Sequence, residues 1–79
     1  MIATENQNRI AEILTEIINT KGLKHVPLSP ETILDQIGLE SLDFAQAVIR
    51  MEEITGKDPF ATGAEYQIKT LSDLAVLYD

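Results

Sequence analysis

The stretch Gly38-Leu39-Glu40-Ser41-Leu42-Asp43 decides the fold, because it joins a turn to a helical pattern that runs from Leu42 to Ile54. Gly38 lacks a Cβ, so it can take the positive φ of a tight turn that a bulkier residue could not adopt without cost. A small residue at the start of a helix faces unpaired backbone N–H groups and the positive end of the peptide dipoles. These groups accommodate a phosphate ester well. The pattern therefore predicts that the Ser41 hydroxyl is an attachment point.

Composition predicts one small helical domain over residues 1–79. The chain is 44% hydrophobic but only 5% aromatic, so its core must consist of Ile, Leu, Val and Ala, which suits packed helices better than aromatic-rich strands. The absence of cysteine excludes disulfides, thiolate metal sites and cysteine nucleophiles. Residues 1–5 lack the basic and apolar segments of a signal peptide, and no apolar run is long enough to span a membrane. We therefore expect a cytoplasmic protein.

The first helix is expected to begin at Thr4, which forms a capping-box pattern with Gln7, and to run to about Asn19. Apolar residues recur in it at three- and four-residue spacing, at Ile10, Ile13, Leu14, Ile17 and Ile18. Gly22 is typical of a left-handed stop. A long loop should follow, ending in a short turn at residues 29–31.

The second helix carries apolar residues over more than one stripe. Helical spacing, together with the resemblance of the Ser41 region to a known family, assigns to the core Ala45, Val48, Met51, Phe44 and Ile54, and to a partly exposed partner face Leu42 and Ile49. A short third helix is expected around Ala64 to Gln67, and Thr70 should cap a last amphipathic helix with Leu71, Leu74, Ala75, Leu77 and Tyr78. The predicted fold class is all-α: a small four-helix bundle with three main helices, one short helix and a long loop between the first two.

The net charge of −7, from thirteen acidic and six basic residues, argues against binding to a nucleic-acid backbone and favours basic partners. Acid is concentrated in residues 31–53, at Glu31, Asp35, Glu40, Asp43, Glu52 and Glu53, against Arg50 alone. Such a field would steer an electropositive enzyme surface toward Ser41. Acidity alone favours a solvated face on a soluble domain over a docking surface.

Other chemistries lack the residues that they need. A serine hydrolase requires a base beside its nucleophile, but His25 is the single histidine, lies in the predicted loop, and no Gly-x-Ser-x-Gly elbow surrounds Ser41. One histidine and no Asp-x-Asp-x-Asp-Gly loop leave no metal site. Glu52 and Glu53 point about 100° apart on a helix, so they do not share a catalytic site. We therefore expect no enzymatic activity.

The residues around Ser41 resemble the phosphopantetheine attachment signature of acyl carrier proteins, in which Gly-x-Asp-Ser-Leu begins the second helix of a small four-helix domain. Here Glu40 stands in place of the aspartate. The resemblance covers nearly all 79 positions, including the Glu52-Glu53 pair and the Thr-Leu-x-Asp-Leu-Ala pattern at residues 70–75. It implies that Ser41 accepts 4′-phosphopantetheine from coenzyme A through a phosphopantetheinyl transferase. The arm's thiol would then hold acyl or aminoacyl groups as thioesters, in fatty acid or polyketide biosynthesis.

The resemblance also implies a free-standing, monomeric carrier with a partner-binding face. The positions that match this face are Glu40, Leu42, Asp43, Ile49, Glu52 and Glu53. They would meet the transferase and the basic surfaces of enzymes that load and transfer acyl groups. Gln46 and Arg50 depart from the strongly acidic second helix of housekeeping fatty-acid carriers, and residues 57–69 are also less acidic than is typical. These departures indicate a dedicated carrier in a specialised pathway. The alternative is an unmodified acidic interaction module in which Ser41 merely caps its helix.

Overall fold

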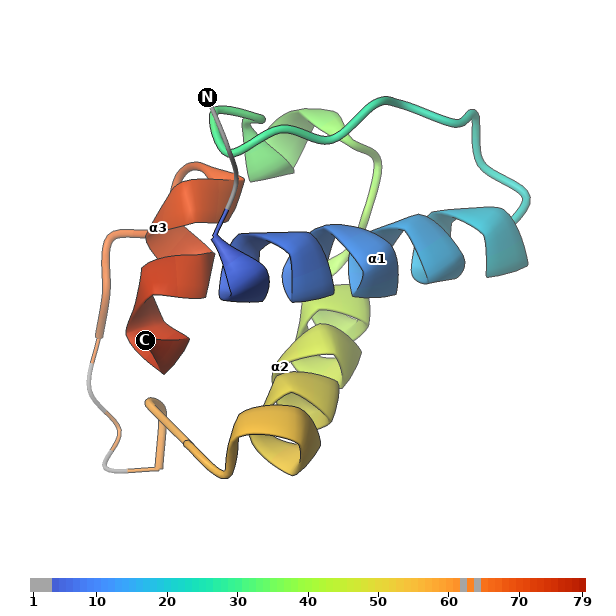
Figure 1. The fold of residues 1–79 in the computed structure, drawn as a ribbon. Helices are drawn as coiled ribbons and strands as arrows, with labels where there is room; N and C mark the ends of the chain where they lie inside the picture. The colour runs from blue at the N-terminus through green and yellow to red at the C-terminus, as the bar shows by residue number, and fades with distance from the viewer. Residues whose placement is uncertain (1–3, 62, 64) are drawn as a thin grey trace.

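Three α-helices and two short 3-10 turns form the described part of the chain. The computed structural model describes residues 4–61, 63 and 65–79. The elements follow in the order α1 (Glu5–Thr20), η1 (Leu34–Gln36), α2 (Ser41–Thr55), α3 (Leu71–Ala75) and η2 (Val76–Tyr78). Helix α1 packs against both α2 and α3, and the long connection after α1 runs back along it toward η1 (Figure 1). The prediction of an all-α fold with a long loop between the first two main helices is confirmed.

Helix α1 begins and ends as the sequence predicts. The Gln7 N–H donates to Thr4 Oγ1 at 3.1 Å, and the Thr4 N–H donates to Gln7 Oε1 at 2.8 Å, which completes the capping box. At the other end Gly22 has a φ of +72°, and the N–H of Leu23 reaches back to the carbonyl of Ile18 at 3.1 Å. All five of its predicted apolar positions are buried.

Helix α2 buries a different stripe from the one predicted. Its buried residues are Ala47 and Met51, with Phe44 and Val48 half-buried beside them. The assignment of Ala45 and Ile54 to the core is wrong, since both are exposed; that of Met51 is confirmed. Residues 44, 47, 48 and 51 form one face at helical spacing, and this face is the one that packs inward. The apolar pattern was too broad to indicate which alanine lies on it.

The predicted third helix is absent from the residues that the structure describes between α2 and α3. Ala64 lies outside those residues, and residues 65–69 are not helical. The Tyr66 hydroxyl donates to the Pro59 carbonyl at 2.9 Å, and its ring packs edge-on against Phe60 with centroids 5.4 Å apart. These contacts hold the segment in an irregular path. A helix of four residues would be too short to offset the free-energy cost of nucleation. The short helical turn lies instead before α2, at η1.

The end of the long connection is bound to the start of α3. The N–H of Leu34 donates to the Lys69 carbonyl and the N–H of Leu71 donates to the Thr32 carbonyl, each at 3.0 Å. A turn closed by the Thr32 N–H and the Ser29 carbonyl, at 3.1 Å, confirms the turn predicted at residues 29–31. Two segments nearly 40 residues apart are thereby held together, which fixes η1 and the exit of the chain toward α2.

The C-terminal turn closes the core. Leu71, Leu74, Ala75 and Tyr78 are all buried, as predicted for the last amphipathic segment. The Tyr78 hydroxyl has no hydrogen-bond partner among the described residues. Burial raises the pKa of Tyr78 to about 12, and the nearby carboxylates of Asp58 and Glu52 act in the same direction.

Candidate functional site: the serine at the start of helix α2

Ser41 is the first residue of α2, and its side chain is exposed. Gly38 has a φ of +81°, which confirms the predicted tight turn. An added Cβ at Gly38 would meet its nearest atom, Leu23 Cδ1, at an ordinary 3.7 Å, so the backbone angle and not lack of space requires glycine there. The N-cap residue is Glu40, with extended backbone angles, and not Ser41.

The hydrogen bonds at the start of α2 leave the serine hydroxyl unoccupied. Asp43 Oδ2 accepts the N–H of Glu40 at 2.9 Å, and the Glu40 carbonyl accepts the N–H groups of Asp43 and Phe44 at 3.0 and 3.2 Å. Within the described residues, no hydrogen bond involves the Ser41 hydroxyl or the N–H groups of Ser41 and Leu42. The hydroxyl thus faces solvent beside two unpaired donors of the first helical turn.

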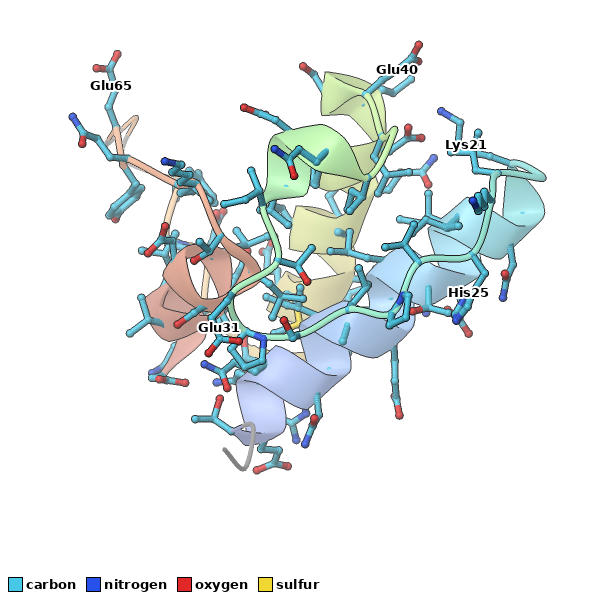
Figure 2. The ribbon with its side chains drawn as sticks, turned by 90° about the horizontal axis from the view of Figure 1, so that it is seen from above. Lys21, His25, Glu31, Glu40 and Glu65 are labelled. Carbon is cyan, nitrogen blue, oxygen red and sulfur yellow. The ribbon has the colours of Figure 1, made fainter. Side chains whose placement is uncertain are left out.

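An ion pair that no sequence pattern predicted lies beside this serine. Lys21, at the end of α1, places its Nζ 2.6 Å from Asp43 Oδ2 and 3.9 Å from Glu40 Oε2. Figure 2 shows Lys21 and Glu40 at the same end of the molecule. The hydrogen bond between Lys21 and Asp43 lowers the pKa of the Asp43 carboxyl and raises the pKa of Lys21. The two partners are 22 residues apart, so no local spacing rule could have revealed the contact.

The predicted partner-binding residues differ in exposure. Leu42 and Ile49 are 73% and 55% exposed, and Glu40, Glu52 and Glu53 are also exposed. Leu42 and Ile49 are seven residues apart and therefore lie on one side of α2. The Asp43 side chain, in contrast, is only 13% exposed and is in contact with Lys21. The structure thus leaves a mainly apolar side of α2 open, with acid at either end.

An apolar groove begins at Ser41. Its wall consists of Ser41, Phe44, Ala45, Val48, Ile49 and Phe60. Phe44, Val48 and Phe60 also line a neighbouring, open and mainly apolar pocket of about 220 Å³, together with Leu34, Asp35, Ile68 and Leu74. Phe60 lies in a turn-rich stretch of the sequence and was not predicted to reach this groove, although it and Phe44 are the two phenylalanines of the chain. Such a groove offers space to an apolar group tethered at Ser41.

No protein-family model and no curated protein matches this sequence. Among solved structures, a match is the solution structure of MacpD, an acyl carrier protein from Pseudomonas fluorescens involved in mupirocin biosynthesis. The TM-score is 0.77 and the sequence identity is 30%, over 91% of this chain and 66% of that chain. This chain is similar in both sequence and fold to that acyl carrier protein. It spans slightly less than two thirds of the MacpD chain.

In the described part of the chain, the groups that other chemistries would need are not gathered around Ser41. His25 is exposed on the long connection beside α1 (Figure 2). Across residues 4–61, 63 and 65–79, no three His, Cys, Asp or Glu side chains are grouped so that they could hold a metal ion. No helix in the described part of the chain combines the length and the apolar character needed to cross a membrane.

Proposed function

We propose that this protein carries acyl or aminoacyl intermediates on a 4′-phosphopantetheine arm esterified to Ser41, and that residues 1–79 form one carrier domain without catalytic activity of its own. The observation that carries the proposal is the exposed, unbonded Ser41 hydroxyl at the first position of α2. The match to MacpD supports the same role. When bound, the arm supplies a thiol on which cargo is held as a thioester.

The residues around Ser41 fit a covalently attached phosphate ester. The unpaired N–H groups of Ser41 and Leu42 and the positive end of α2 favour negative charge there. The carboxylates of Glu40 and Asp43 oppose it, but the ammonium group of Lys21 offsets one of these two charges. An attached phosphate therefore meets little electrostatic strain.

The exposed side of α2 supports a role in docking. We propose that Leu42 and Ile49 contact a phosphopantetheinyl transferase and the enzymes that load and transfer acyl groups. Glu40, Glu52 and Glu53 would attract the basic surfaces of these enzymes. Asp43 belongs to the same proposed set of partner-binding residues, although its carboxylate is already paired with Lys21.

The cargo belongs, in this proposal, to a specialised pathway. Gln46 and Arg50 make α2 less acidic than in the housekeeping carriers, and Arg50 is paired with Glu16 of α1. The relative MacpD is involved in mupirocin biosynthesis, which is consistent with a dedicated carrier. The apolar groove that begins at Ser41 would shelter an apolar part of the cargo.

The decisive experiment is intact mass spectrometry of the unmodified protein after incubation with coenzyme A and a broad-specificity phosphopantetheinyl transferase. We expect the mass to increase by one phosphopantetheine group. Ser41→Ala should abolish the gain completely, because the attacking hydroxyl is removed. Ser29→Ala is the matched control. Ser29 lies in the turn near the end of the long connection, and its hydroxyl lies 3.3 Å from Thr32 Oγ1. That variant should be loaded like the wild type.

Failure of the wild-type protein to gain mass would contradict the proposal and favour the unmodified acidic interaction module. A gain that persists in Ser41→Ala would place the attachment at another residue. Turnover of acyl thioesters by the purified protein alone would contradict the absence of catalytic activity.

A further inference from the structure

Lys21 is distinguished from the other basic residues by its position between the two acids that flank Ser41. Its Nζ contacts Asp43 Oδ2 at 2.6 Å and lies 3.9 Å from Glu40 Oε2. The Lys21 side chain is 30% exposed and its Nζ lies against Asp43, whose side chain is 13% exposed. The ion pair therefore lies at the rim of the surface that a partner must approach to reach the serine.

The remaining ion pairs of the described residues lie elsewhere. Arg9 pairs with Glu5 within α1, and Arg50 pairs with Glu16 nine positions beyond Ser41 on α2. Glu52 and Glu53, at the far end of α2, form no salt bridge with any described residue. Acid next to Ser41 is thus partly neutralised from within the molecule, whereas acid at the far end of α2 is not.

We propose that Lys21 is a specificity-determining residue, an internal counter-ion that occupies Oδ2 of the Asp43 carboxylate and so competes with a partner's cation for the acid beside Ser41. The proposal rests on the proposed carrier function and deepens it. A partner that engages the apolar residues Leu42 and Ile49 loses nothing by the presence of Lys21. A partner that relies on a lysine or arginine directed at Asp43 is disfavoured, because it must compete with a cation already in place.

Asp43 keeps its role at the start of α2 without Lys21. Its Oδ2 accepts the Glu40 N–H at 2.9 Å, which is a contact within the helix end itself. Loss of Lys21 should therefore leave Ser41 at its place while exposing the Asp43 charge. An effect of Lys21 on partner selection and an effect on the placement of Ser41 are thus separable in kinetics: the first changes KM and the second changes kcat.

The test compares Lys21→Gln, Lys21→Arg and Lys24→Gln as substrates of a phosphopantetheinyl transferase with a basic docking surface, with coenzyme A saturating. Lys24 is exposed on the long connection, so Lys24→Gln makes the same change in net charge as Lys21→Gln. We expect Lys21→Gln to lower the KM for the carrier by about two- to fivefold at low salt, with the change in kcat smaller than the change in KM. The gain should vanish near 1 M salt, where charges are screened over about 3 Å. Lys21→Arg, which keeps the cation, should resemble the wild type.

A second measurement follows the contact itself by carboxyl-carbon NMR titration. The Asp43 pKa should rise in Lys21→Gln toward its ordinary value and stay low in Lys24→Gln, because the Lys21 hydrogen bond is the largest cause of its lowering. An unchanged Asp43 pKa in Lys21→Gln would overturn the inference.

The kinetic outcomes also separate the two proposals. A wild type that is loaded, with Lys21→Gln and Lys24→Gln giving the same KM, refutes the role of Lys21 alone. A lowered kcat at constant KM would make Lys21 a structural support and refute it equally. A wild type that gains no phosphopantetheine refutes the carrier function and this inference with it.

Discussion

Helices α1 and α2 are almost equally long, with 16 and 15 residues, but they use their apolar residues in opposite ways. Helix α1 buries five large aliphatic side chains and α2 buries only Ala47 and Met51. Three large apolar residues of α2 are exposed, namely Leu42, Ile49 and Ile54. Helix α1 thus supplies the largest share of the core of any element, while α2 presents apolar surface to solvent along its length.

The two helices therefore contribute to different properties of the protein, α1 to its stability and the outer side of α2 to the binding of partners. Burial of a large aliphatic side chain contributes about 1.5–3 kcal/mol, so α1 accounts for much of the stability of a small core. Exposed apolar residues contribute little to folding, and a cluster of them marks an interaction surface. Substitutions in α1 should therefore act on unfolding, and those on the outer side of α2 should act on partners.

The largest effect is expected for Leu14→Ala in α1. Leu14 is fully buried, and truncation of such a leucine costs about 2–5 kcal/mol through lost burial and the cavity left behind. The free energy of unfolding, measured by urea denaturation and far-UV circular dichroism, should fall by that amount. A loss below about 1 kcal/mol would show that the core collapses around the cavity and that α1 contributes less to stability than its five buried side chains suggest.

A smaller effect on the free energy of unfolding is expected when one of two alanines of α2 is replaced by leucine. Ala47→Leu forces extra methylenes into a position with no exposed surface and should cost about 1–3 kcal/mol in unfolding free energy. Ala45→Leu makes the same change at an exposed position and should stay within about 0.5 kcal/mol of wild type. Equal losses for the two variants would mean that α2 packs in a different rotation. Thermal denaturation under identical conditions compares them directly.

The smallest effect on stability is expected for Leu42→Ala, the same substitution as in α1 but on the outer side of α2. Leu42 is 73% exposed, so the free energy of unfolding should change by no more than about 0.5 kcal/mol. The KM for the phosphopantetheinyl transferase should rise about fivefold, the effect of losing about 1 kcal/mol at an interface. A destabilised variant, or an unchanged KM, would contradict the assignment of stability to α1 and of partner binding to the outer side of α2.

Local signals determined the parts of this fold that depend on near neighbours in the chain. Thr4 and Gln7 predicted the start of α1, Gly22 its end and Gly38 the turn before Ser41, because caps and left-handed turns depend on residues within about one helical turn. The position of Ser41 at the start of α2 was predictable for the same reason. The family resemblance of its surroundings then led to the functional hypothesis.

Contacts between distant segments could not be predicted in this way. The sequence placed a short helix near residue 64, but Tyr66 is held by Pro59 and Phe60 in an irregular path. Phe60 becomes part of the groove at Ser41 only because that path brings it over α2.

By itself, the sequence determined the helical class, the ends of α1, the turn at Gly38 and a serine at the start of a helix, since periodicity and capping act over a few residues. Only the tertiary structure decided which side of α2 is buried, with Ala47 inside and Ala45 outside, and that Lys21 pairs with Asp43 beside Ser41. These outcomes depend on how α1 crosses α2, and the relative placement of two helices is set by packing across the whole core and not by any local pattern.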